Sequence, residues 1–157
     1  MTSPTIKAFF DENTYTVTYI VSDPETASAA IIDPVLDYDA ASGRTDTRSA
    51  DAVVDYVKAQ ALSVEWIIET HVHADHLSGA HYLKEQVGGR TGIGRDVVTV
   101  QDTFRKIFNI ERLAADGSQF DRLFADDDTF SIGQLEGRAM HTPGHTPACM
   151  TYVIGDA

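Results

Sequence analysis

The sequence lacks the features of an exported or membrane-spanning protein. Its 157 residues include one cysteine, Cys149, so no internal disulfide can form, which fits a reducing compartment. No stretch approaches the roughly 18 apolar residues of a membrane-spanning helix. The first residues, Met1 to Pro4, have neither the charged region nor the apolar run of a secretory signal. We therefore expect a cytoplasmic protein.

Positive charge is also scarce, because 12 Lys and Arg stand against 24 Asp and Glu, giving a net charge of -12. Nucleic acids and anionic membranes require basic patches, so we expect neither as a partner. The same negative field would favour a divalent cation. Repeats and low-complexity segments are absent, and 43% hydrophobic with 23% charged residues is typical of a soluble globular protein. The length predicts one domain, over positions 1–157.

Most of the histidines lie in two short windows. The first follows the apolar residues Ile67 and Ile68 and reads Glu69-Thr70-His71-Val72-His73-Ala74-Asp75-His76. In an extended segment His71 and His73 point the same way, because side chains repeat every two residues. Asp75 and His76 lie where the chain turns towards the next predicted helix, and they could face a second ion. Imidazole and carboxylate together suit zinc, iron or manganese.

The second window is His141-Thr142-Pro143-Gly144-His145. Its Pro143-Gly144 pair predicts a tight turn from which His145 can project. Three of the six histidines fall in the first window alone, which makes an ordinary polar surface loop a poor explanation. The candidate metal ligands are therefore the following residues: His71, His73, Asp75, His76 and His145.

Two other polar residues have simpler interpretations. His81 stands alone on a predicted helix and is expected at the surface. Asp33 follows a predicted strand and precedes Pro34. Asp33 is either a turn carboxylate or a carboxylate that orients a ligand histidine, a partner that metal-bound histidines commonly have.

Hydrophobic periodicity predicts alternating strands and helices. Strands are expected at 14–19, 29–32, 62–69, 91–94, 129–132, 135–140 and 149–154. Helices are expected from a cap at Thr47 or Ser49 to Ala61, at 77–87, and at 97–108. The segment 36–47 is expected to be a surface loop, and 121–128 a solvated acidic turn. The consecutive apolar residues at 66–68 suit an interior strand covered on both faces. Gly155-Asp156 is the dipeptide of a hairpin turn.

The two histidine windows carry a family resemblance. Thr70 to His76 reads T-H-x-H-x-D-H and resembles the signature of the metallo-β-lactamase superfamily, and His141 to Thr146 resembles the segment that supplies its third histidine. Ile32 to Leu36, together with His73 to His76, resembles the glutathione-persulfide dioxygenases (sulfur dioxygenases). Glyoxalase II, a family of glutathione-thioester hydrolases, is closely related. The resemblance runs from about Phe9 to the last residue.

The resemblance implies an α/β fold, the four-layer αβ/βα sandwich, of which this chain would hold the N-terminal half and the start of the second half. It implies that a bridging aspartate follows the third histidine, and that this aspartate and the glutathione-binding residues lie beyond Ala157. Asp156 is an unsuitable substitute, because the strand after His145 would carry it some 20 to 30 Å from the metal end (about 3.3 Å per residue).

The implied chemistry has two main versions. In the first, His71 and His145 bind a mononuclear non-haem Fe(II), and the enzyme oxidises glutathione persulfide to sulfite and glutathione with O2. In the alternative, two metal ions such as Zn(II) bind through His71, His73 and His145 and through Asp75 and His76, and the enzyme hydrolyses a glutathione thioester. Asp75 and His76 are the catalytic candidates.

A third hypothesis is a chain that binds metal weakly and has a regulatory or structural role. The expected partner is a small thiol or persulfide linked to glutathione, and a homodimer is one candidate assembly.

Overall fold

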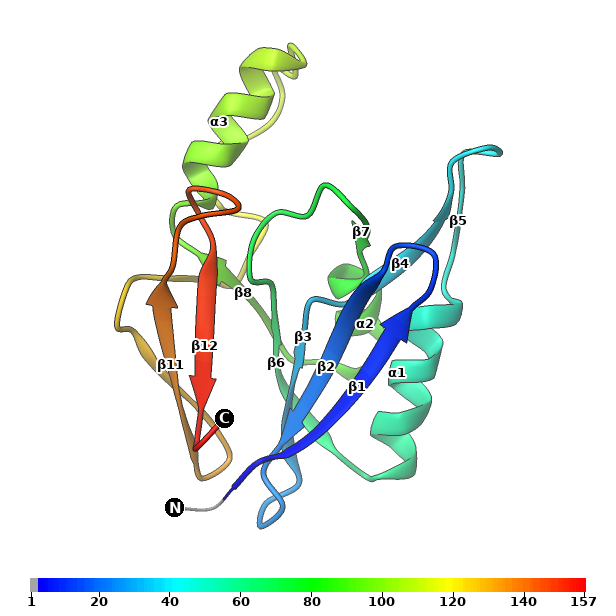
Figure 1. Ribbon diagram of the computed structural model, residues 1–157, viewed down its shortest axis with the longest axis vertical. Helices are drawn as coiled ribbons and strands as arrows, with labels where there is room; N and C mark the ends of the chain where they lie inside the picture. Colours follow the sequence, from blue (N-terminus) through cyan, green and yellow to red (C-terminus); the bar gives the residue numbers. More distant parts are fainter. Residues whose placement is uncertain (1–2) are drawn as a thin grey trace.

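The computed structural model describes residues 3–157, within which the chain forms twelve strands and three helices (Figure 1). The strands are β1 (Thr5–Asp11), β2 (Thr16–Ser22), β3 (Ser28–Ile32), β4 (Val35–Asp39), β5 (Arg44–Asp46), β6 (Ser63–Ile68), β7 (Leu77–Ser78), β8 (Arg90–Gly94), β9 (Arg122–Phe124), β10 (Thr129–Ile132), β11 (Leu135–His141) and β12 (Met150–Ile154). The helices are α1 (Arg48–Ala59), α2 (Ala80–Val87) and α3 (Val97–Ile107).

The central element is a six-stranded sheet in the order β1-β2-β3-β6-β8-β9. The pairs β1–β2 and β2–β3 are antiparallel, whereas β3–β6, β6–β8 and β8–β9 are parallel. On β3 all five residues are buried, and successive side chains point to opposite faces. Ile31 joins the core on the helical side, and Ile32 joins the core on the other side. On β6, Ile67 joins the core on the helical side and Trp66 and Ile68 join the other, which confirms the prediction that residues 66–68 form an interior strand covered on both faces.

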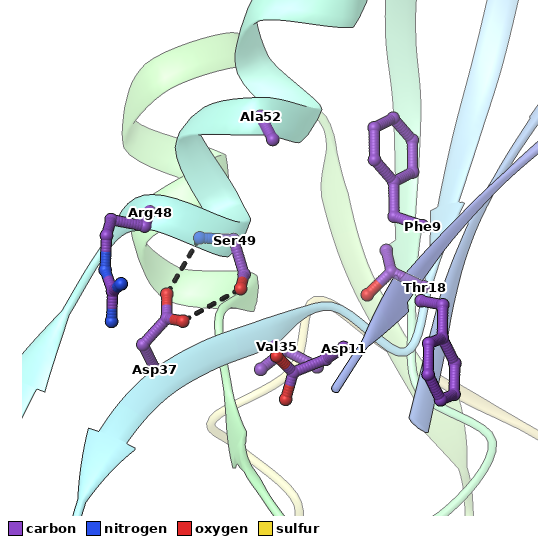
Figure 2. A pocket seen from close by; sticks show the side chains of 9 residues that line it. Phe9, Asp11, Thr18, Val35, Asp37, Arg48, Ser49 and Ala52 are labelled. Carbon is purple, nitrogen blue, oxygen red and sulfur yellow. Dashed lines mark hydrogen bonds between the residues drawn. The ribbon is translucent and has the colours of Figure 1, made fainter. Parts of the chain in front are cut away.

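Helices α1 and α2 cover one face of the sheet through a core that includes Val53, Val57 and Leu83. The first turn of α1 is held by a carboxylate from β4, since Asp37 accepts hydrogen bonds from Ser49 N at 2.8 Å and Ser49 Oγ at 2.9 Å (Figure 2). Thr47 occupies the cap position without a side-chain hydrogen bond to the helix backbone. The expected cap at Thr47 or Ser49 is therefore replaced by a residue distant in sequence.

A three-stranded sheet, β10-β11-β12, packs on the opposite face of the central sheet. Trp66 of β6 fills this interface: it is 1% exposed, its Nε1 donates to Ser131 O at 3.0 Å, and its ring lies 5.5 Å from that of Phe124 and 5.8 Å from that of Phe130. The predicted hairpin at 129–140 is confirmed. The structure therefore has three of the layers of the predicted sandwich: helices α1 and α2, the six-stranded sheet, and the sheet β10-β11-β12. This confirms the α/β fold class.

Several sequence-based boundaries were wrong. The expected surface loop at 36–47 contains β4 and β5, which pair with each other. The helix expected at 77–87 begins only at Ala80, because Leu77–Ser78 forms β7 and pairs with β4. The acidic segment at 121–128 contributes β9, which pairs with β8.

Helix α3 projects from the top edge of the molecule (Figure 1). The apolar stripe predicted on α3 and the residue after it is buried at Val97 and Val100, but Phe104 is 40% exposed and Phe108 is 63% exposed. Among the helices of residues 3–157, none combines the length and apolar character needed to cross a bilayer.

Candidate metal centre

The first histidine window forms the loop between β6 and β7 at the top edge of the central sheet (Figure 1). Strand β6 ends in the apolar residues Trp66, Ile67 and Ile68, and the Glu69 N–H still bonds to the carbonyl oxygen of Gly92 at 2.9 Å. The chain then leaves the sheet. Met150 N, at the start of β12, donates to Thr70 O at 2.9 Å and ties the second sheet to this loop.

The second histidine window forms the connection between β11 and β12, at the same edge of the molecule (Figure 1). Thr142 N donates to Cys149 O at 2.9 Å, which closes the loop at its base. His141 lies at the end of β11 and its Nε2 is 2.8 Å from Pro147 O, so this histidine braces the loop. His145, at the exposed tip, projects towards the first window.

The two loops bring four histidine rings into a row. The ring centroids are 5.0 Å apart for His145 and His71, 4.1 Å for His71 and His73, and 4.1 Å for His73 and His76. Asp75 Oδ1 lies beside the row, 3.3 Å from Nδ1 of His76 and 3.7 Å from Nδ1 of His73. The structure thus gathers all five candidate ligands predicted from the sequence.

Asp33 lies directly beneath this row. Its carboxylate accepts Thr70 N and Thr70 Oγ1, each at 2.7 Å, and lies 3.0 Å from Nε2 of His73. Asp33 adopts a left-handed backbone conformation with φ of 49°, which Asp and Asn tolerate better than most residues. Of its two sequence interpretations, this geometry matches the carboxylate that orients a ligand histidine.

Glu69 is a site residue that the sequence reasoning missed. It is 3% exposed, its Oε2 lies 3.1 Å from Nε2 of His73, and its Oε1 accepts the hydroxyl proton of Ser78. Its position in the sequence could have indicated this role. Glu69 stands directly after a buried strand and directly before the histidine motif, so its carboxylate is expected to be buried there and to require a hydrogen-bond partner. The pKa of Glu69 is raised, chiefly by its burial. Burial also acts to raise the pKa of Asp33, but the hydrogen bonds from His73 and Thr70 and the charge of His73 together outweigh it and lower that pKa.

The hydrogen bonds assign the tautomer of each of the first two histidines. The single hydroxyl proton of Thr70 goes to Asp33, so Thr70 Oγ1 accepts from Nδ1 of His71 at 2.9 Å. His71 therefore leaves Nε2 free to bind a metal. Nε2 of His73 faces two carboxylates and must carry a proton, so His73 leaves Nδ1 as its metal-binding nitrogen.

The pKa values of the histidine rings in the row are shifted in different directions. Burial lowers the pKa of His71 and of His76, and the neighbouring His73 lowers both further. At His73 burial acts in the same direction, but hydrogen bonds from the ring to Asp33 and Glu69 outweigh it and raise the pKa to about 10. A metal ion at Nδ1 of His73 would replace that proton.

His76 tests whether the site suits a metal. Its side chain is 1% exposed. Within residues 3–157 neither ring nitrogen makes a hydrogen bond, because the 3.3 Å contact of Nδ1 with Asp75 Oδ1 lacks hydrogen-bond geometry. A buried imidazole with both nitrogens unsatisfied is costly unless an ion or ligand is bound. Ligand atoms of His73, Asp75 and His76 lie within 4.8 Å of one another, and a cavity of about 180 Å³ adjoins the row, lined in part by Ile93 and Phe120. The residues present fit a metal centre.

Two dismissed residues lie away from the row. The side chain of His81 is 89% exposed and faces Glu85 at 3.6 Å, as expected for a surface residue. Asp156 lies in a two-residue turn closed by hydrogen bonds in both directions between Ile154 and Ala157, at 2.9 and 3.1 Å, and it accepts Ser3 Oγ at 2.6 Å. Figure 1 places this turn at the end of β12 opposite the histidine loops.

Comparison with known proteins places the chain among metal-dependent enzymes. The family model described as the metallo-beta-lactamase superfamily matches residues 12–157. A probable metallo-hydrolase of Burkholderia pseudomallei is 56% identical over 98% of this chain and 52% of its own length. The persulfide dioxygenase ETHE1 of Bos taurus is 30% identical over 96% of this chain and 48% of its own length. The chain therefore spans about half the length of these relatives.

Among solved structures, ETHE1 from Myxococcus xanthus superposes with a TM-score of 0.72 and 26% identity, covering 97% of this chain and 54% of that one. The two chains therefore share their fold over nearly the whole of this chain.

Proposed function

Because the chain belongs to the metallo-beta-lactamase superfamily, we propose that its histidine row binds a catalytic metal and that the protein is a persulfide dioxygenase. The proposed reaction consumes one persulfide, one O2 and one water, and yields the thiol, sulfite and two protons. A small thiol such as glutathione is the proposed carrier of the persulfide sulfur. The supporting observation is the contact between His71 and His145, whose ring centroids are 5.0 Å apart although the residues come from different sheets.

In this proposal His71 and His145 hold a non-haem Fe(II) together with one carboxylate. Two histidines and one carboxylate leave open positions for substrate and O2, and the bound iron would supply the oxygen chemistry. Asp33 acts on His71 through Thr70, since the hydroxyl that bonds to Asp33 at 2.7 Å also accepts from the His71 ring at 2.9 Å. His73, Asp75 and His76 would then lie around the iron without binding it, or form a vacant second site.

The second candidate function is hydrolysis of a glutathione thioester by two metal ions. The unsatisfied ring of His76 favours it, because a second ion between His76, Asp75 and His73 would give both a partner. In that case His71, His73 and His145 hold the first ion, and the pair would present a metal-bound hydroxide to the carbonyl carbon. The 56% identity to a probable metallo-hydrolase supports this candidate.

Parallel assays on anaerobically purified full-length protein separate the two candidates. The dioxygenase proposal predicts O2 uptake that depends on glutathione persulfide, with one sulfite formed per O2, in protein that contains iron. The hydrolase candidate predicts release of thiol from an acylglutathione without O2 uptake, in protein with two ions per chain. Thioester hydrolysis without persulfide-dependent O2 uptake in iron-loaded protein would overturn the dioxygenase proposal.

A further inference from the structure

We propose that Glu69 and Ser78 are positioning residues for His73, linking its ring to the first turn of α2 so that Nδ1 stays directed at the metal. The inference rests on the proposed metal centre in the version in which His73 binds an ion, as in the two-metal candidate, and it concerns how the chain holds that one ligand. Asp33 is the orienting carboxylate that sequence reasoning anticipated. Glu69 is a second carboxylate that contacts the same nitrogen, Nε2 of His73, and it comes from a different part of the fold than Asp33.

Glu69 is placed for this role by burial and by its few contacts. Its side chain is 4% exposed, and its two oxygens have separate partners: Oε2 is 3.1 Å from Nε2 of His73, and Oε1 accepts from Ser78 Oγ. No Lys or Arg within residues 3–157 forms a salt bridge with it, because its one ion-pair contact there is His73. A buried carboxylate without a strong partner costs several kcal/mol, on the order of the usual desolvation penalty. His73 is the group that offsets this cost.

Ser78 is held rigidly although it lies near the surface. Strand β7 pairs with β4 through Val35 and Ser78, and Gly79 N donates to Pro34 O at 2.8 Å. A Cβ atom on Gly79 would lie 2.8 Å from the carbonyl oxygen of Val35, so only glycine permits this close approach of the two strands. Ser78 Oγ also accepts Ala80 N, the first residue of α2, at 3.1 Å. The Ser78 hydroxyl is thereby directed at Glu69.

The two carboxylates constrain the ring from different sides. Asp33 directly follows β3, and its carboxylate also accepts from Thr70 N and from Thr70 Oγ1. Glu69 follows β6, and its other hydrogen bond goes to Ser78 before α2. One acceptor on Nε2 fixes the tautomer, whereas two acceptors from different elements also restrict rotation of the imidazole. Negative charge on the far nitrogen also makes Nδ1 a stronger donor to a metal.

Zinc affinity of the full-length protein, measured by competition with a chelator, tests this inference without depending on which reaction the enzyme catalyses. Glu69→Gln keeps the shape of the side chain and its bond to Ser78, but removes the negative charge. We expect it to weaken zinc binding about 10- to 100-fold, the usual effect of removing an outer-shell partner. Ser78→Ala should weaken zinc binding less, because it removes the support of Glu69 and not its contact with His73.

The matched control is Glu65→Gln, since Glu65 lies on β6, the strand that Glu69 follows, and its oxygens face Gly133 N at 3.3 and 3.4 Å, away from the histidines. Zinc affinity of this variant should equal that of the wild type. The visible spectrum of the Co(II)-loaded protein gives a second measurement, because a change in ligand orientation shifts the d–d bands, whereas a general loss of stability does not.

A Glu69→Gln protein that folds, binds zinc within twofold of the wild type and shows an unchanged Co(II) spectrum would overturn the inference. If Glu69→Gln does not fold, the same two measurements on Ser78→Ala test the inference: unchanged zinc affinity and an unchanged Co(II) spectrum would overturn it. Failure of the proposed function gives a different result: wild-type protein that binds no zinc, or whose zinc affinity is unaffected by His71→Ala.

Discussion

The substitution Asp33→Asn barely changes the shape of the side chain, but it should strongly disturb the metal centre. Asparagine tolerates the left-handed conformation that Asp33 adopts, with φ of 49°, so the backbone need not move. The side chain, however, exchanges one acceptor oxygen for a donor NH2. Asp33 accepts from Thr70 N, from Thr70 Oγ1 and from His73 Nε2, so the NH2 finds an acceptor only if the Thr70 hydroxyl reverses its role.

The consequence can be followed atom by atom. Thr70 N and His73 both donate to Oδ1, so the amide oxygen is required there and the NH2 takes the place of Oδ2. The NH2 then donates to the Thr70 hydroxyl, whose own proton must turn to Nδ1 of His71. The ring proton of His71 moves to Nε2, which is the nitrogen assigned to the metal.

The magnitude follows from the two ligands affected. Loss of one outer-shell partner usually costs 10- to 100-fold in metal affinity, and here both His71 and His73 lose their orienting charge. We expect a loss of about 100-fold or more, roughly 2.8 kcal/mol at 1.4 kcal/mol per tenfold. The metal-free protein should lose about 2–3 kcal/mol of stability, since hydrogen bonds to a charged acceptor contribute about 1.5–3 kcal/mol each and some are kept.

The assay is chelator competition for zinc, combined with NMR of the histidine ring nitrogens to read the tautomer of His71. The matched control is Asp23→Asn. Asp23 is fully buried and accepts Glu25 N, Thr26 Oγ1 and Gln134 N, away from the histidines, so this variant should lose stability and keep its zinc affinity. Unchanged zinc affinity in Asp33→Asn, with His71 still protonated on Nδ1, would refute the reasoning.

Two further predictions concern stability. Trp66→Ala should lower the free energy of unfolding by about 3–5 kcal/mol, because it empties the interface between the sheets, where Trp66 is 1% exposed; a melting temperature within a degree or two of wild type would contradict this. The metal-free protein should melt at progressively lower temperature as the pH rises from 7 to 10. The pKa of His73 is raised from 6.5 to about 10. Protonation of His73 therefore stabilises the folded state. This contribution to the free energy of unfolding is complete below about pH 6.5 and is lost as the pH rises through about 10. A melting temperature that does not fall across this range would show that His73 is not protonated in the folded protein.

The sequence predicted the ligands of the site better than their supports. His71, His73, Asp75 and His76 fall within six positions, so a local pattern is enough to find them. Glu69 could not be assigned in this way, because its role depends on Ser78 and on the pairing of β7 with β4. Asp33 lies between these cases, since its place after a strand suggested a carboxylate partner but not which histidine it contacts.

The same distinction holds for the fold. The hairpin of β10 and β11 has alternating buried and exposed residues, a local signal that predicts it correctly. Strand β5 is exposed at every residue, so no apolar alternation marks it. Strand β9 is defined by its parallel pairing with β8, a contact between residues about thirty positions apart by subtraction of the paired numbers. Helix α3 is the opposite case, because the sequence has an apolar stripe but the structure buries only its first half, at Val97 and Val100.

The most direct test of the central claim is the metal content of anaerobically purified full-length protein and of three single variants. His71→Ala and His145→Ala remove residues from the two separate loops whose rings meet at 5.0 Å, and His81→Ala removes an exposed histidine as the control. A shared centre predicts that each of the first two variants loses most of its bound iron, while His81→Ala keeps the wild-type stoichiometry. Full iron content in either His71→Ala or His145→Ala would contradict the claim that the two loops form one metal centre.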